Sequence, residues 1–415
     1  MRIYIYIMAT VSISAPSAPA HPLRNPGFRL LWTGRAISSL GDQFYLVALP
    51  WLVLQLTSSS VALGTIMMTA AVPQAVFMLL GGAVSDRVSP RRVWMTTTSA
   101  RTLCVAVIGA LVWLHVLQLW QIYVLALAFG IADAFAAPAA QAFLPSVVEK
   151  EQLPAANSVT QATQQLAAIV GPAPAGIVVK ALGTAWAFII DAVSFLFVIA
   201  ALWKLPDPPP PPAAVRKTGV FHSIAQGLYY IAGDPALRSL LLLAVAVNFC
   251  LTGPMSIGLP WIAKSVFASP IAFSVFVTSV AAGGLTGVLL AGWIKPRKRG
   301  LLMLGVSAFI GACVAVFGLF ANIAIFAVTL FAIGTAAGFL NVHIIAWFQQ
   351  RVDREMLGRA MSVLSLAAIG LQPISLFVAG VAVTWSLAAM FIGAAALVLV
   401  AAAVVALHSS VREIE

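Results

Sequence analysis

The sequence has 415 residues, of which 61% are hydrophobic and only 8% are charged, with a mean hydropathy of +1.02. A soluble domain needs roughly a quarter of charged residues to cover its surface, so this composition excludes a soluble globular protein. The net charge of +11 could suit nucleic-acid binding. The basic residues nevertheless lie between long apolar segments, which indicates membrane topology and no nucleic-acid partner.

The first 27 residues are expected to form a cytoplasmic tail. Residues 1–20 hold a short apolar stretch followed by Ala-Pro-Ala at 18–20, which resembles a signal-peptide cleavage site. Polar residues interrupt the stretch and prolines crowd the site, so the sequence favours a disordered tail over a cleaved signal. Met8 is a second candidate for the start of translation.

Twelve apolar segments are long enough to be membrane-spanning helices, each of which needs ~20 residues to cross ~30 Å of hydrocarbon. Their apolar runs are continuous rather than alternating, which favours helices over the strands of a barrel. The expected spans are 29–57, 61–85, 91–114, 119–145, 154–182, 184–204, 236–264, 270–294, 300–320, 322–348, 358–383 and 385–407.

Lys and Arg residues indicate the orientation of these spans. Most of the 23 lie in the tails and in the loops after even-numbered spans, whereas the opposite loops carry only Lys180 and Lys264. Cytoplasmic loops are rich in Lys and Arg, so both termini are expected in the cytoplasm and the protein in the inner (plasma) membrane. The expected organisation is a tail (1–27), a six-helix bundle (28–205), a linker with an amphipathic helix (206–235), a second six-helix bundle (236–407) and a tail (408–415).

The two halves repeat each other in sequence. Residues 48–52, Ala-Leu-Pro-Trp-Leu, match residues 258–262, Gly-Leu-Pro-Trp-Ile, at an offset of 210, and Gly130 matches Gly334 at an offset of 204. Parallel six-span repeats with the substrate path at their interface are typical of transporters. The repeat therefore predicts an all-α integral membrane protein with two pseudo-symmetric six-helix bundles.

The loop after the second span contains Gly82, Asp86, Arg87, Arg91 and Arg92. This loop resembles the G-x-x-x-D-R-x-G-R-R signature of the major facilitator superfamily, although residues 89 and 90 differ from it. The resemblance implies the major facilitator fold and secondary transport. We expect Asp86 to cap a facing helix, in the eleventh span, and to pair with nearby arginines, which would close the cytoplasmic side. The alternative is that the arginines only set the topology.

Within the superfamily, the chain is similar to the drug/proton antiporter branch of macrolide-efflux and enterobactin-export proteins. The fifth span carries Gly171, Pro172 and Gly176, which resemble the G-P-x-x-G-G motif of exporters with a different spacing. Ordinary helix packing is the alternative explanation for this motif. The stretches that carry the resemblance to the branch are 41–50, 138–157 and 358–359.

Ionisable residues at membrane depth are expensive and are therefore candidates for function. Asp42, Arg101 and Asp133 are expected at the same depth in spans 1, 3 and 4, where they would form a proton-linked triad. A static salt-bridge network is the alternative. Asp191 is expected nearer the outer surface as a structural residue, with Lys180 suggested as its partner.

The second half has no acid within its spans, and Asn248 is its expected cavity residue, opposite the Asp42 region by the repeat. These features predict proton-coupled efflux of a small amphipathic compound, such as a drug, a siderophore or a secondary metabolite. Import of a small solute and a non-transporting membrane partner protein are the alternatives. The sequence lacks a Walker-type loop and catalytic motifs, so we expect no enzyme activity, no cofactor and no metal. The expected partners are the substrate, protons and the lipid bilayer, and the protein is expected to be a monomer.

Overall fold

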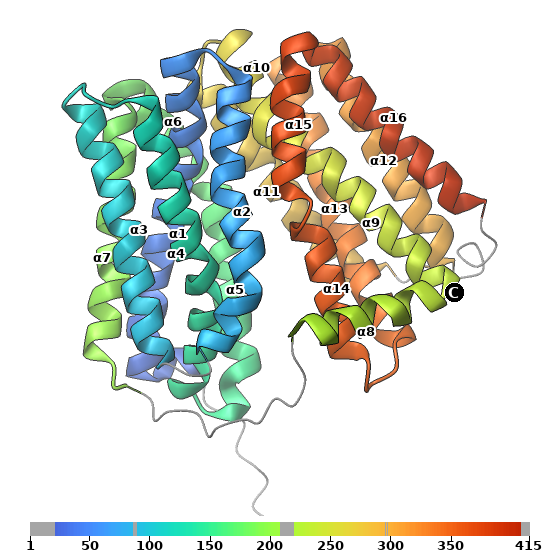
Figure 1. Cartoon of the computed structure of the whole chain (residues 1–415), viewed down its shortest axis with the longest axis horizontal. Helices are drawn as coiled ribbons and strands as arrows, with labels where there is room; N and C mark the ends of the chain where they lie inside the picture. Colours follow the sequence, from blue (N-terminus) through green and yellow to red (C-terminus); the bar gives the residue numbers. More distant parts are fainter. Residues whose placement is uncertain (1–20, 86–88, 208–219, 295, 297, 408–415) are drawn as a thin grey trace, which may run out of the picture.

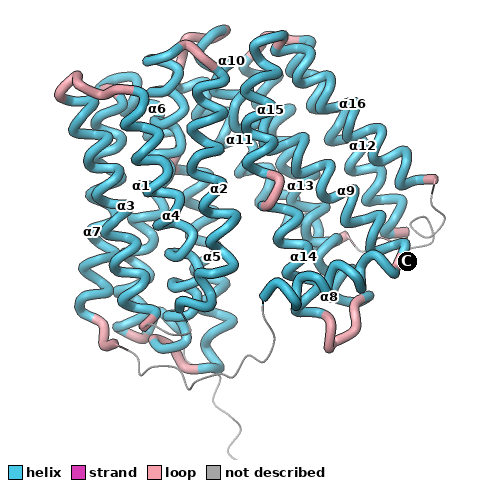
Figure 2. Tube along the Cα trace, viewed as in Figure 1, coloured by secondary structure: helices cyan, strands magenta, loops and turns pink. Residues whose placement is uncertain are grey.

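The computed structural model describes residues 21–85, 89–207, 220–294, 296 and 298–407. The described residues form helices joined by short loops, and no strand occurs among them (Figure 2). The helices are α1 (Pro26–Thr57), α2 (Ser60–Ser85), α3 (Pro90–Trp113), α4 (Leu119–Phe143), α5 (Leu153–Val170), α6 (Pro172–Leu182), α7 (Thr184–Lys204), α8 (Val220–Gly233), α9 (Pro235–Gly253), α10 (Leu259–Ser265), α11 (Pro270–Trp293), α12 (Arg299–Leu319), α13 (Ile323–Arg351), α14 (Leu357–Ile369), α15 (Gln372–Trp385) and α16 (Leu387–Ala406). Short 3-10 helices cover Pro22–Arg24, Leu144–Ser146 and Lys150–Gln152, and a π-helical turn covers Pro254–Gly258.

These helices make up twelve segments that are long and apolar enough to cross a membrane, among the residues that the structure describes. The predicted twelve-span, all-helical fold is confirmed. Three spans are each built from two helices: α5 with α6, α9 with α10, and α14 with α15. Each break coincides with proline, at Pro172, Pro254 and Pro373, because proline cannot donate the N–H that a continuous helix needs.

The two bundles are related by equivalent contacts as well as by sequence. In the first bundle the α-carbon of Gly130 on α4 packs against the backbone of Ala70 on α2. In the second bundle Gly334 on α13 packs in the same way against Val280 on α11. Ala70 and Val280 lie 210 residues apart, which is the offset seen between residues 48–52 and 258–262. Close backbone approach at small residues is a common basis of helix packing in membranes.

The bundles meet at one end of the molecule, which we call the sealed end, and lie further apart at the end that carries α8 (Figure 1). At the sealed end the Ser60 hydroxyl donates to the Gly380 carbonyl at 2.8 Å, and the Lys264 ammonium donates to the Leu54 carbonyl. Deeper in the molecule Gln165 Nε2 on α5 donates to the carbonyl of residue 281 on α11 at 2.8 Å. These contacts join α1, α2 and α5 of the first bundle to α10, α15 and α11 of the second.

Helix α8 packs against the second bundle. The α-carbon of Gly227 lies against the carbonyl of Arg359 on α14, and the Tyr230 hydroxyl donates to Asp353 Oδ2 at 2.9 Å. The next residue after α8, Asp234, caps α9 by accepting from the backbone N–H groups of residues 236 and 237. Asp234 also forms a 2.9 Å ion pair with Arg351 at the end of α13.

This cap gives a prediction about stability at the α8 end. Partial burial raises the pKa of Asp234, but the Arg351 guanidinium and the backbone donors outweigh burial and lower this pKa below its usual range. The stabilisation is therefore present above the ordinary aspartate pKa of about 3.9 and is lost as the pH falls through the lowered value. We expect Asp234→Ala to cost about 0.5–2 kcal/mol through the lost cap. Thermal unfolding of the purified protein at neutral pH measures this cost.

Asp234→Asn is the matched control, because asparagine caps a helix as well as aspartate does. We expect it to keep most of the stability that Asp234→Ala loses. Equal losses in the two variants would mean that the ion pair with Arg351, rather than the cap, stabilises this junction.

Candidate functional site: a charged cluster and an uncharged cavity

Three ionisable side chains from α1, α3 and α4 meet inside the first bundle. Arg101 Nη2 lies 2.9 Å from Asp42 Oδ1, and Arg101 Nη1 lies 3.5 Å from Asp133 Oδ1. The Arg101 side chain is 15% exposed, whereas those of Asp42 and Asp133 are 40% and 29% exposed. The arginine therefore lies behind two carboxylates that remain open to the space in front of them.

Neighbouring side chains hold this cluster in place. Gln74 Nε2 on α2 donates to Asp133 Oδ2 at 3.1 Å. The Arg101 guanidinium lies over the rings of Phe129 and Phe195, at 5.0 Å and 4.5 Å from their centroids. Cation–π contacts of this kind are worth most where water is excluded. The sequence predicted the three charged residues, but Gln74 and the two rings were missed because their contribution depends on how each helix is rotated.

A cavity of about 320 Å³ lies in front of the charged cluster. The side chains of Asp42, Arg101 and Asp133 line it together with polar residues of α1, α3 and α5. Arg35 also lines it and lies over the Trp94 ring at 5.4 Å. This cavity can bind polar groups, protons or cations at its carboxylates.

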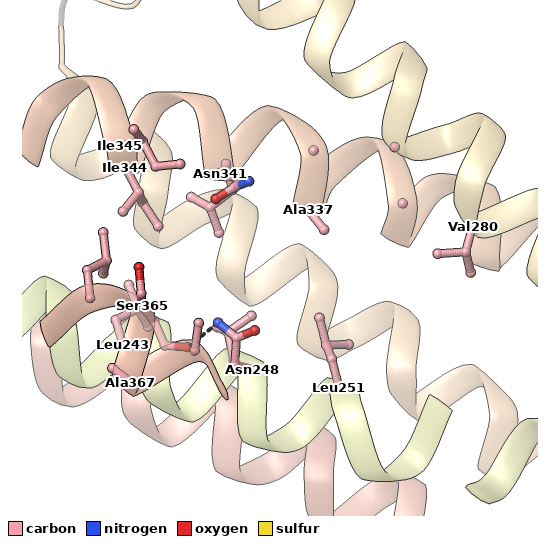
Figure 3. Close-up of a pocket in the computed structure, with 18 of the residues that line it drawn as sticks. Leu243, Asn248, Leu251, Val280, Ala337, Asn341, Ile344, Ile345, Ser365 and Ala367 are labelled. Carbon is pink, nitrogen blue, oxygen red and sulfur yellow. Dashed lines mark hydrogen bonds between the residues drawn. The ribbon is translucent and has the colours of Figure 1, made fainter. Parts of the chain in front are cut away.

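A second cavity, of about 540 Å³, lies within the second bundle and differs in chemistry. Its lining includes no ionisable residue, and apart from Asn248, Asn341 and Ser365 it is formed by apolar side chains and glycines. Figure 3 shows Asn248 from α9 and Asn341 from α13 on opposite sides of this cavity. Asn248 Nδ2 donates to the Ala244 carbonyl of its own helix at 3.0 Å. Asn248 and the Asp42 cluster thus lie in separate cavities, one in each bundle.

The loop between α2 and α3 is only partly described. Gly82 lies within α2, whereas Asp86 and Arg87 lie outside the described residues, so the expected contact of Asp86 with the eleventh span stays a prediction. Arg91 donates to the carbonyl of Leu202 at 2.6 Å and to that of the next residue at 3.1 Å, at the end of α7. Arginines at a helix C-terminus satisfy its last carbonyls and its dipole.

Arg92 also bonds beyond the end of α7, by a 2.9 Å ion pair with Asp207. The Ser89 hydroxyl, which donates to Asp207, and the Arg92 guanidinium lower the pKa of this exposed carboxyl. Arg91 and Arg92 therefore stabilise the first bundle at its α8 end by holding α3 against α7.

The motif of the fifth span lies at the break between α5 and α6. Pro172 begins α6, and a side chain at Gly171 would collide with the side chain of Gln43 on α1. The α-carbon of Gly176 packs against Ser274 of α11 in the second bundle. Gly176 is thus one of the close contacts that join the two bundles.

This contact gives a prediction about closure of the sealed end. A leucine at position 176 cannot fit against Ser274, so we expect Gly176→Leu to separate α6 from α11 and to shift molecules toward a conformation open at this end. The measurement is labelling by a membrane-impermeant maleimide of a cysteine placed at buried Ser60, in a background without native cysteines. We expect faster labelling in Gly176→Leu.

Gly305→Leu on α12 is the control, because no atom lies within 4 Å of a Cβ built there. It should label at the parental rate. An unchanged rate in Gly176→Leu would contradict a role of this contact in closure.

Asp191 on α7 does not contact its suggested partner. Its side chain is fully buried, and its Oδ1 lies 3.5 Å from the Ser194 hydroxyl, whereas Lys180 is exposed. The suggested pairing with Lys180 is wrong, because the carboxyl packs against Gly41 of α1, inside the bundle. The depth of Asp191 in its span was a poor guide, because the rotation of α7 decides which side the carboxyl faces.

Comparison with known proteins agrees with this architecture. The family model described as Major Facilitator Superfamily matches residues 31–371. Macrolide efflux protein A of Streptococcus pyogenes is 25% identical over 364 residues, covering 84% of this chain and 89% of the relative. Multidrug efflux pump Tap of Mycobacterium tuberculosis is 26% identical over 369 residues, covering 86% of this chain and 87% of the relative.

Solved structures share the fold at low sequence identity. The nucleoside transporter NupG superposes with a TM-score of 0.73 at 10% identity, covering 94% of this chain and 100% of NupG. A bacterial homologue of the human lysosomal transporter Spinster, in an inward-facing and unoccupied conformation, gives a TM-score of 0.68 at 13% identity, covering 94% of this chain and 98% of that one. The family match, the relatives and the twelve spans together show that the chain is a multi-pass membrane transporter, not an enzyme, and that it belongs to the major facilitator superfamily.

Proposed function

We propose that the protein exports a small amphipathic compound across the inner membrane in exchange for protons, by alternating access. It would act as a monomer without a cofactor. The observation that carries this proposal is the position of Arg101 between two carboxylates that face a cavity. Two acids that share one cation at membrane depth can bind and release a proton without a large change in packing.

Proton binding and ion pairing compete at this cluster. When Asp42 or Asp133 takes a proton, it loses its attraction to Arg101, and the charge that remains on the other carboxylate pairs with the arginine. A substrate with a cationic or hydrogen-bonding end would compete for the same carboxylates. Such competition links the flux of protons to the flux of substrate, because carboxylates that release their proton on one side of the membrane can bind substrate there.

The two cavities together favour an amphipathic substrate. The cavity of the first bundle offers charged and polar groups, whereas that of the second bundle offers apolar walls with two amides. A compound with one polar end and one apolar body would place each part against matching chemistry. This pattern agrees with the similarity to a macrolide efflux protein and a multidrug efflux pump.

We also propose that the α8 end faces the cytoplasm and that both termini lie there. The support is the distribution of Lys and Arg, which favours the loops on the α8 side. In this orientation the sealed end is the outer one, and the conformation described above is open toward the cytoplasm.

A susceptibility panel with the gene deleted and overexpressed tests the direction of transport and the substrate class. We expect overexpression to raise, and deletion to lower, tolerance to at least one amphipathic compound, with erythromycin as the first probe. Uptake of erythromycin into energised cells should fall on overexpression. Increased accumulation on overexpression would instead show import.

A further inference from the structure

The strongest unexplained feature is the carboxyl of Asp191. Its side chain has no exposed surface, and its Oδ2 meets no hydrogen-bond donor among the described residues. Within the part of the chain that the structure describes, its Oδ1 has only the 3.5 Å contact with Ser194, whose hydroxyl already donates to the Asp191 carbonyl at 2.7 Å. An ionised carboxylate without a partner in such a site costs several kcal/mol, so burial favours the neutral form of this group.

Asp191 lies directly behind the charged cluster. A Cβ built on Gly41 would lie 2.9 Å from Asp191 Oδ1, so the carboxyl packs against the α-carbon of residue 41. The next residue of α1 is Asp42, which faces the cavity and accepts from Arg101. Asp191 therefore packs against the residue that directly precedes Asp42 in α1.

Arg101 carries a second buried polar atom without a partner in the described part of the chain, and this atom is a donor whereas Asp191 Oδ2 is an acceptor. Nε of Arg101 is buried and meets no acceptor among the described side chains and backbone. The Arg101 guanidinium already lies over Phe195, which is one turn beyond Asp191 on α7. A rotation of the arginine from Asp42 toward α7 would therefore bring a cation toward the buried acid.

The other ionisable groups around Asp191 are few. Asp42 and Tyr45 on α1 and Arg101 on α3 lie close enough to interact with its charge. Helix α6 contributes only Lys180, which is exposed. Arg101 is therefore the one cation near the acid on the described helices that pack against α7.

We propose that Asp191 is a further proton-binding carboxyl of the transport cycle, behind Asp42 and Asp133, which holds a proton in this conformation and passes it to Asp42. As Arg101 turns from Asp42 to Asp191, the proton moves in the opposite direction, and the charge of the cluster is unchanged. The proton on Asp42 then faces the cavity and leaves to water there. This inference rests on the proton coupling proposed above.

Infrared spectroscopy of the full-length protein in lipid tests the inference without a substrate. At neutral pH we expect a carbonyl band of a protonated carboxylic acid that is lost in Asp191→Asn and retained in Asp42→Asn and in the surface variant Asp207→Asn. Ser194→Ala should shift the same band, because it removes the only polar contact of Oδ1. A band that persists in Asp191→Asn would overturn the inference.

Thermal stability gives an independent readout. Asparagine replaces a neutral carboxyl at nearly equal size, so Asp191→Asn should unfold at the temperature of the parent protein. A large loss of stability would show that the acid is ionised and paired, which contradicts the inference.

Transport assays complete the test. In proteoliposomes, Asp191→Asn should lose uptake of erythromycin driven by a pH gradient and keep exchange of erythromycin at equal pH. Full pH-driven uptake in this variant would overturn a role in the cycle. If Asp42→Asn and Asp133→Asn also keep pH-driven uptake, the proposed function is wrong. If only Asp191→Asn keeps pH-driven uptake, the role of Asp191 is wrong and the proposed function stands.

Discussion

Replacing Asp42 by asparagine is expected to abolish transport driven by a pH gradient while leaving the fold intact. The amide keeps the size of the carboxyl and can still accept from Arg101, at the site where the present bond is 2.9 Å. It cannot gain or lose a proton in the working pH range, so the link between proton and substrate is removed. Exchange of substrate at equal pH on both sides should continue.

The measurement is uptake of labelled erythromycin into proteoliposomes with and without an imposed pH gradient. Asp133→Asn should behave similarly, although its longer 3.5 Å contact with Arg101 suggests a smaller effect. Asp207→Asn is the matched control, because its carboxyl lies outside the spans and pairs with exposed Arg92. If both membrane variants respond to the gradient as the parent does, the proton role of the cluster is wrong.

Removing the arginine should have the largest effect on stability. Arg101→Ala leaves Asp42 and Asp133 without their shared cation. Breaking a fully buried ion pair from one side costs about 3–5 kcal/mol, and the partial exposure of the two carboxylates makes this an upper bound here. It also removes the two cation–π contacts with Phe129 and Phe195. Arg92→Ala, at a side chain that is 71% exposed, should cost about 0–1 kcal/mol.

A double-mutant cycle separates the charge effect from lost packing. We expect Arg101→Ala combined with Asp42→Asn to be more stable than Arg101→Ala alone, because the second change removes an uncompensated charge. Thermal unfolding in detergent measures all four proteins. Strict additivity of the two changes would show that Arg101 contributes packing alone.

The fold was largely predictable because membrane insertion constrains the sequence directly. Each of the twelve spans needs a long apolar run, and the repeat between residues 48–52 and 258–262 already related the halves. The breaks were harder to place, because proline accompanies each of them but also lies inside helices that continue. Pro172 begins α6 after the break, whereas Pro50 and Pro138 lie within continuous helices.

The site was predictable in part because the membrane also constrains where charged residues can lie. Charges at membrane depth must find partners, so Asp42, Arg101 and Asp133 were expected together, and they do lie together. Their roles remain predictions. Depth along a helix could not assign the surroundings of Asp191, because its packing against Gly41 depends on the rotation of α7.

The placement of Asn248 shows another limit of the sequence. The repeat placed Asn248 opposite the Asp42 region, but the conformation of the two bundles decides whether their cavities join. In this structure the two groups line separate cavities of about 540 and 320 Å³. A repeat in sequence relates positions within bundles and does not set the distance between them.

The most direct test of the account is simultaneous recording of proton and erythromycin fluxes in proteoliposomes that contain only this protein. The account predicts that an outward erythromycin gradient drives protons in the opposite direction and that Asp42→Asn abolishes this proton movement while exchange continues. Erythromycin flux without any proton movement in the parent protein would contradict it.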